Sequence, residues 1–219
     1  MAPSRGPVDL SELSTAELLA GALREVSQDD PDHPMPHLVA LHGRPTREVW
    51  DAAVRLVARA DPAERELGVR ILRELGDPDD AGRRPFRGAT VPLLVERLGH
   101  EVDPRVLGWV ISALGYHHAR EALRDVLRFV DHAGGPVRFH VAAALPALVD
   151  EGRAEPEAVR ALQLLCRDDD ADTRYYALVA LVEEVSGVDP ELITRTLTGL
   201  LDDPDEQIRE LAVTHIGGG

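Results

Sequence analysis

Residues 167–185 have the sequence RDDDADTRYYALVALVEEV, and this stretch decides the fold. Acidic residues come first, and apolar residues then recur at the spacing of one face of an α-helix. Aspartates suit the start of a helix, because their side chains accept hydrogen bonds from its free N–H groups and their charge complements its dipole. The stretch therefore predicts a turn followed by an amphipathic helix. The apolar residues of its face are Leu178, Leu181, Val182 and Val185.

The same element recurs along the chain, each time preceded by another amphipathic helix. The apolar stripes of these first helices begin 32 to 42 residues apart, at Val49, Val91, Leu123, Ala158 and Ile193. Those of the second helices begin at Gly68, Leu107, Val141, Leu178 and Ile208. Helix pairs at this interval are typical of a stack in which each repeat covers its neighbour. We therefore predict an all-α fold, an α-solenoid of about five helix pairs.

The domain organisation follows from where the repeat begins and where it is interrupted. We expect residues 1–13 to be a disordered tail, residues 14–45 a divergent helical cap, and residues 46–216 the solenoid. The Pro- and Gly-rich segment 76–89 is either a plain insertion or a functional loop, and its arginines Arg83, Arg84 and Arg87 either grip an acidic partner or are solvated. The predicted repeats are 46–76, 88–115, 118–150, 156–186 and 189–216.

Composition excludes several classes of function. The 39 acidic residues outnumber the 24 basic ones and give a net charge of −15, which argues against a nucleic-acid binder, since phosphates select Lys and Arg. We find neither a signal peptide nor an apolar run near the ~18 residues of a membrane span, so we expect a cytoplasmic protein that does not enter membranes. The single cysteine, Cys166, excludes an internal disulfide and is expected to be buried.

Two stretches, residues 167–185 and LLDDPDEQIRELAV at 200–213, resemble the HEAT repeat consensus, which belongs to the armadillo-type superhelices. We expect a HEAT-repeat protein of bacterial type. In that family an Asp in the turn and an Arg at the start of the second helix form a ladder along the stack. Arg105 has no acid at the matching distance. The residues that match the ladder are Asp168 and Arg174, Asp203 and Arg209, and, at a spacing of seven instead of six, Asp131 and Arg138.

Aromatic residues on the second helices give the candidate binding site. Helical geometry places several of them opposite the apolar stripe, and in solenoids that this chain resembles the second helices line the concave surface. Aromatic and Arg side chains dominate interface energetics. The alternative is that these rings pack between adjacent repeats. The candidate residues are Arg70, Arg73, Arg105, Trp109, Tyr116, Phe139 and Tyr176, with Glu206 and Glu210 at the far end.

Two enzyme classes on this scaffold are the alternatives to a binding protein. HEAT-type deoxyhypusine hydroxylases bind iron through several His-Glu pairs, but this chain has one, His100-Glu101. A metal site would require His117, His118 and His140 to converge. HEAT-like alkylpurine DNA glycosylases use a basic face, which the net charge does not favour. We therefore predict no catalytic residue, no metal and no cofactor.

The function that remains is a non-enzymatic scaffold or adaptor that binds a protein or peptide on its concave face. The net negative charge favours a basic partner. Solenoid ends need a polar cap. The last predicted helix is nevertheless apolar and is followed at once by three glycines; its apolar residues are Ile208, Leu211, Val213 and Ile216. Either the natural protein continues, or a partner or a second copy, as in a homodimer, covers that end.

Overall fold

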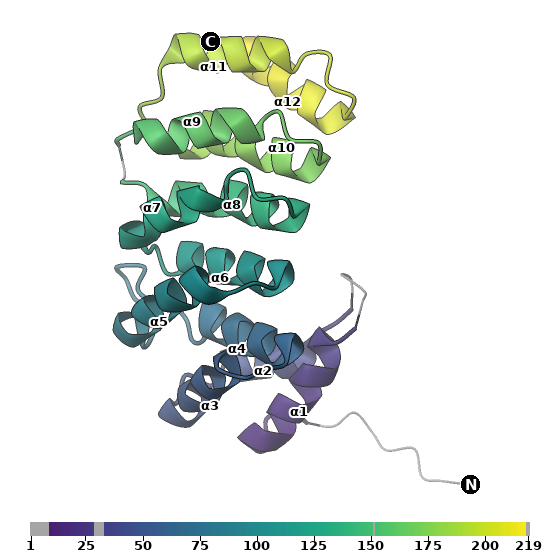
Figure 1. The fold of residues 1–219 in the computed structure, drawn as a ribbon, viewed down its shortest axis with the longest axis vertical. Coiled ribbons are helices and arrows are strands. Elements are labelled where there is room, and N and C mark those ends of the chain that lie inside the picture. Colours follow the sequence, from purple (N-terminus) through teal and green to yellow (C-terminus); the bar gives the residue numbers. More distant parts are fainter. Residues whose placement is uncertain (1–8, 29–32, 151, 218–219) are drawn as a thin grey trace, which may run out of the picture. The chain divides into compact units, whose positions relative to one another are not determined.

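A computed structural model describes residues 9–28, 33–150 and 152–217. Every regular element in these ranges is a helix (Figure 1), which agrees with the all-α prediction. None of the described helices is long and apolar enough to cross a bilayer. The chain divides into two compact units, unit 1 over residues Met1–Thr90 and unit 2 over Val91–Gly219.

Unit 1 is built around its fourth helix, which packs against the other three. The helix starts are encoded locally: Ser14 and Glu17 form a capping box, and Thr46 and Asp61 each accept a backbone hydrogen bond. Gly68 allows a close helix crossing, because a Cβ there would lie 2.7 Å from the carbonyl oxygen of Ala53. The helices are α1 (Thr15–Val26), α2 (Pro36–His42), α3 (Arg47–Val57) and α4 (Pro62–Glu74).

The chain just before α1 is fixed to α2. The Arg44 guanidinium donates hydrogen bonds to the carbonyl oxygens of Leu10, Ser11 and Leu13, at 2.6–2.8 Å. Residues 1–8 of the predicted tail lie outside the described residues. In residues 10–13, the half-buried guanidinium of Arg44 satisfies three backbone carbonyl groups, and the disorder of the tail as a whole stays a prediction.

The segment between α4 and the next helix is braced by its own arginines. Arg83 pairs with Asp79 at 3.1 Å, and Arg84 donates to the carbonyl oxygen of Gly76 at 2.5 Å. The Phe86 ring stacks on Trp50 with ring centroids 5.7 Å apart. Arg83 and Arg84 therefore hold the conformation of this loop, and a role of its arginines in binding an acidic partner stays a prediction.

Unit 2 is a stack of helix pairs. Its second helices pack on one another in chain order, α6 on α8, α8 on α10 and α10 on α12 (Figure 1). The helices of the stack are α5 (Arg87–His100, which begins in unit 1), α6 (Pro104–Tyr116), η1 (Arg120–Ala122), α7 (Leu123–Val126), η2 (Leu127–Phe129), α8 (Gly135–Leu148), α9 (Pro156–Leu165), α10 (Ala171–Val179), η3 (Ala180–Glu184), α11 (Pro190–Gly199) and α12 (Glu206–Gly217).

One predicted first helix is interrupted. The apolar stripe that begins at Leu123 predicts a continuous helix, but residues 120–129 form a short α-helix between two 3₁₀ turns. Spacing of three residues is compatible with both helix types, because a 3₁₀-helix also places residues i and i+3 on one side. The apolar side of this segment nevertheless faces the interior of the protein, and its residue Val126 is fully buried.

Candidate functional site

An arginine recurs four residues after the N-cap of most second helices. Each of these guanidinium groups turns back and donates to the backbone carbonyl oxygens five and six residues before it. Each arginine thus closes its own repeat by satisfying the carbonyl groups of the turn between the two helices. The arginines, each with its N-cap, are Arg65 (Asp61), Arg138 (Gly134), Arg174 (Asp170) and Arg209 (Asp205).

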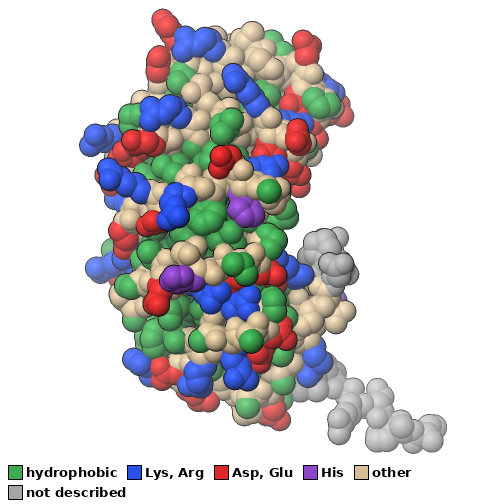
Figure 2. Space-filling model, viewed as in Figure 1, with side chains coloured by type: hydrophobic (Ala, Val, Ile, Leu, Met, Phe, Trp, Pro, Cys, Tyr) green, Lys and Arg blue, Asp and Glu red, His purple; other side chains and the backbone are tan. Residues whose placement is uncertain are grey.

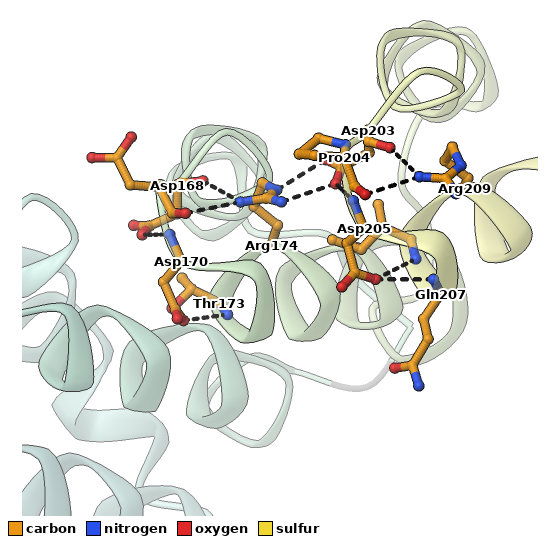
Figure 3. A network of polar contacts seen from close by, with 11 residues as sticks. Asp168, Asp170, Thr173, Arg174, Asp203, Pro204, Asp205, Gln207 and Arg209 are labelled. Carbon is orange, nitrogen blue, oxygen red and sulfur yellow. Dashed lines mark hydrogen bonds and ion pairs between the residues drawn. The ribbon is translucent and has the colours of Figure 1, made fainter.

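Two of these arginines also reach an aspartate of the following repeat. Arg174 donates two hydrogen bonds to the Asp203 carboxylate, both of 2.9 Å (Figure 3). Arg138 makes the equivalent pair with Asp168, at 2.5 and 2.8 Å. The side chains of Arg174 and Asp203 are only 9% and 5% exposed. Such paired bonds between ionised groups are short and directional, so each rung of this Arg–Asp ladder fixes one repeat against the next.

The pKa values of the aspartates agree with ion pairs in both rungs. Hydrogen bonds from Arg138 hold the pKa of Asp168 below its ordinary value. Burial would raise the pKa of Asp203, but the hydrogen bonds from Arg174 and the backbone outweigh it, so this pKa is also lowered. Both carboxylates are therefore ionised at neutral pH.

The ladder prediction is wrong for Asp131. Asp168 and Asp203 lie two residues before an N-cap, and each accepts a hydrogen bond from the N–H of that cap residue. In the repeat of Arg138 this position is occupied by His132, whose Nδ1 accepts from the N–H of Gly134 at 3.0 Å. Asp131 is one residue out of register and is exposed.

The register of the repeat around Arg105 also differs from the prediction. Counted from the N-cap Asp103, the ladder position is Leu107, so this repeat lacks the arginine. The acid of the turn is Glu101, which is buried, accepts from the N–H groups of Val102 and Asp103, and pairs with Arg97 at 2.8 Å. Glu101 therefore belongs to the turn that precedes α6, where it is buried.

Four rings form a continuous aromatic row across α6, α8 and α10. Trp109 lies 5.2 Å from His140, His140 lies 5.2 Å from Phe139, and Phe139 lies 5.1 Å from Tyr176, all measured between ring centroids. Tyr176 is 45% exposed, and the other three rings are half-buried. The structure thus brings the predicted Trp109, Phe139 and Tyr176 together. The rings contact one another between repeats and still present surface, and their part in binding stays a prediction.

His140 is the member of the row that sequence reasoning missed. Trp109, His140 and Tyr176 each lie six residues after the N-cap of their helix, and this equal spacing is the signal that would have identified it. Its ring lies against Gly108, where a Cβ would be 2.4 Å from His140 Cδ2. The absence of a side chain at Gly108 therefore determines where the row crosses from α6 to α8.

The other predicted site residues are not part of the row. Tyr116 is exposed at the end of α6, and Arg105 is exposed near its start. Arg70 and Arg73 belong to unit 1: Arg70 is 15% exposed in a pair with Glu66 at 3.2 Å, and Arg73 pairs with Glu74. The participation of these four residues in binding stays a prediction.

The fully exposed charged side chains of α10, η3 and α12 are acidic. Acidic and basic side chains are interspersed on the face drawn in Figure 2. On α8 and α10, in contrast, Arg138 and Arg174 are held in the ladder, and on α12 Arg209 donates to the backbone carbonyl groups of its turn. The acidic residues that accompany them on α10, η3 and α12 are exposed: Asp172, Glu183, Glu184, Glu206 and Glu210.

In the part of the chain that the structure describes, the histidines do not come together as a metal site. Within the described residues, no group of three or more His, Cys, Asp or Glu side chains is placed to hold a metal ion. His140 lies in the aromatic row, and His117 is buried after α6. Cys166 is buried as expected, and burial raises the pKa of its thiol to about 12.

The geometry of unit 2 agrees with the comparison of its sequence with known families. Residues 91–182, which include α6, α8 and α10, match a family model described as HEAT repeats. Residues 91–182 are thus similar to HEAT repeats. The resemblance to the HEAT consensus is thereby confirmed, and the pair of Arg138 with Asp168 is a ladder contact that joins two of the matched repeats.

Solved structures with the same fold extend over nearly the whole chain. The Escherichia coli protein YibA is 14% identical, with a TM-score of 0.74, over 98% of this chain and 77% of that one. A designed armadillo repeat protein in complex with the peptide (KR)4 is 14% identical, with a TM-score of 0.61, over 92% and 98%. An archaeal HEAT-like repeats protein from Thermococcus onnurineus NA1 is 16% identical, with a TM-score of 0.50, over 97% and 81%. These similarities confirm the α-solenoid fold, whereas a search of curated proteins gave no match.

Proposed function

We propose that the HEAT repeats of unit 2 are a non-enzymatic scaffold that binds a protein or peptide segment across the second-helix face, the surface formed by α6, α8, α10 and α12. The aromatic row carries this proposal. Tyr and Trp side chains combine a large apolar area with a polar group and few rotatable bonds, and they are enriched among residues that dominate binding energy. A row fixed by Gly108 offers such rings at little cost in conformational entropy.

A basic segment fits this face best. The exposed carboxylates of α10 and α12 attract cations, and the exposed ring of Tyr176 can also hold an Arg or Lys side chain through a cation–π contact. The designed neighbour in complex with (KR)4 supports the proposal by analogy, since its fold is similar. That the second-helix face is the concave one stays a prediction.

A display library of random nine-residue peptides, selected against the full chain, tests the binding face. Peptides enriched on the unmodified protein should bind Tyr176→Ala about 30-fold more weakly, because loss of a dominant interface residue costs ~2 kcal/mol or more. Leu164→Ala is the matched control, since Leu164 is exposed on the first helix α9, and it should leave the affinity unchanged. Equal losses in both variants would contradict the proposal.

Two further measurements test the non-enzymatic part. The purified protein should contain no stoichiometric iron or zinc, and it should not bind duplex DNA at physiological salt. A positive result in either would favour the enzyme classes that use this scaffold.

A further inference from the structure

The helix α12 exposes a surface that the preceding second helices of unit 2 bury. This surface, the end face, consists of Arg209, Val213 and Ile216. We infer that the end face binds a helix pair of the HEAT type on a partner protein, with a carboxylate in the turn between its two helices. The end face does not include the aromatic row, so the inference goes beyond the proposed function and is tested independently of it.

Two apolar positions of the repeat distinguish α12 from the other second helices. They are the eighth and the eleventh residues after the N-cap of each helix. In α12 they are Val213 and Ile216, which are 60% and 41% exposed. A repeat that closes a stack carries polar residues on its outer side, so α12 has the composition of a repeat that is covered by another. The corresponding residues of α6, α8 and α10, all fully buried, are Ile111 and Leu114, Ala142 and Leu145, and Leu178 and Leu181.

Arg209 has the geometry of a ladder donor. In Arg138 and Arg174, Nη1 donates to the carbonyl groups of the turn, while Nε and Nη2 together hold the aspartate of the next repeat. The Nη1 of Arg209 makes the same turn contacts, to the carbonyl oxygens of Asp203 and Pro204 at 2.7 and 3.0 Å (Figure 3). Within the described ranges, no carboxylate pairs with its Nε or Nη2. The end face therefore presents two N–H donors beside two exposed apolar side chains.

The contact between α10 and α12 shows what covers such a surface. There Arg174 pairs with Asp203, which lies two residues before the N-cap of α12, and the two apolar residues of α10 are buried. A helix pair with a carboxylate at the same place of its turn would repeat this contact on the end face. Its acid would accept both N–H groups of Arg209, and its helices would remove the apolar pair of α12 from water.

The carboxylates at this place of the turns in unit 2 are already held, so a second copy of this chain does not supply one from there. Asp168 and Asp203 pair with arginines of their own stack, and Glu101 pairs with Arg97. The partner must therefore bring a turn whose acid has no arginine before it. The first repeat of another stack meets this requirement, because no repeat precedes it.

A helix pair of this chain serves as the probe. A copy of residues 182–216 is joined to the full chain directly after Ile216, so that Asp203 of the copy follows Arg209 at the spacing by which the original Asp203 follows Arg174. A protease site in the copied turn 186–188 is then cut, which leaves the helix pair held only by its contacts. Its dissociation constant is measured by dilution, from the fluorescence anisotropy of a dye on the copy.

The cleaved pair should stay bound, and two variants should weaken its binding about tenfold or more. Val213→Gln in the receiving chain reduces the apolar area that is buried. Asp203→Asn in the copy alone removes the charge that Arg209 binds but keeps the oxygen that accepts the N–H of Asp205 in its turn. Val102→Gln is the matched control, since Val102 is 88% exposed in the turn before α6, and it should leave the dissociation constant unchanged.

The inference fails if the cleaved pair does not bind, or if either variant binds as tightly as the unmodified pair. It also fails if the full chain without the copy forms a dimer in analytical ultracentrifugation that Val213→Gln dissociates, since a second copy then covers the end face. None of these results bears on the second-helix face, whose own test is the loss of peptide binding in Tyr176→Ala.

Discussion

Replacing Arg174 by methionine should destabilise the C-terminal part of unit 2 severely. Arg174 donates two hydrogen bonds to Asp203 and two more to the carbonyl oxygens of Asp168 and Asp169, at 2.9 and 3.1 Å. The variant leaves the 5%-exposed Asp203 carboxylate without its cation. Breaking a buried pair from one side costs about 3–5 kcal/mol, because the remaining charge is desolvated and uncompensated.

Two further variants distinguish this mechanism from a general loss of packing. Arg174→Met combined with Asp203→Leu should recover most of the lost stability, since two apolar side chains can replace a buried ion pair at little net cost. Arg120→Met is the matched control, because Arg120 pairs with Asp150 at 3.1 Å while the two side chains are 46% and 57% exposed. Loss of such a surface pair should cost about 1 kcal/mol or less.

Urea unfolding followed by far-UV circular dichroism measures the three differences in free energy of unfolding. Repeat proteins can lose one end of the stack first, so hydrogen exchange of the α10 and α12 amides should accompany it and show where protection is lost. If Arg174→Met is as mild as Arg120→Met, or if the double variant is no more stable than the single one, the ladder does not stabilise the stack as described.

Three other properties of the molecule can be tested independently. The folded-state pKa values of Asp168 and Asp203 are lowered, so the contribution of these ionised groups to stability should be complete above about pH 4 and should disappear as the pH falls through the folded-state pKa values. Urea titrations at acidic pH would show this loss, and a free energy of unfolding that does not change there would contradict it. Gly108→Ala should cost about 1–3 kcal/mol and shift the NMR signals of His140, since the new Cβ would collide with its ring, whereas an unchanged melting temperature would refute the close contact. Cys166 should react with a disulfide reagent only after unfolding, because burial raises its pKa to about 12 and the thiolate is the nucleophile; rapid reaction of the native protein would be inconsistent with this.

Helices and their stacking could be predicted from the sequence because both depend on local patterns. Apolar spacing and the N-caps Asp61, Asp103 and Asp189 mark where the helices lie. The ladder was harder to predict from the sequence. The prediction counted residues from the acid to the arginine, whereas in the structure both residues lie at fixed distances from the N-cap. At position 132 a histidine replaces the acid and accepts the same backbone hydrogen bond, so the sequence has no acidic residue that identifies this position.

The candidate site shows a different limit. Helical periodicity placed Trp109, Phe139 and Tyr176 on one side of their helices, but their contact depends on how far neighbouring helices slide along each other. That shift is set by packing at Gly108 and His140, and by Gly115, where a Cβ would lie 3.1 Å from the Ala144 Cβ. Contacts between residues about 30 positions apart are not encoded in the pattern of either helix alone, so the row could be anticipated as a surface but not as a chain of touching rings.

The ladder has a consequence for how such a chain can grow. The repeat between residues 154 and 188 carries both halves of a rung, an acceptor in Asp168 and a donor in Arg174. If this segment were duplicated in tandem, the original Arg174 would meet the copied Asp168, and the copied arginine would meet Asp203. The preceding repeat has the donor Arg138 but His132 in place of the acidic acceptor, and the repeat of α6 has Leu107 in place of the donor, so neither has this property. Gene duplication or protein engineering could therefore lengthen the molecule from within at this segment, because each new junction would form the same Arg–Asp pair.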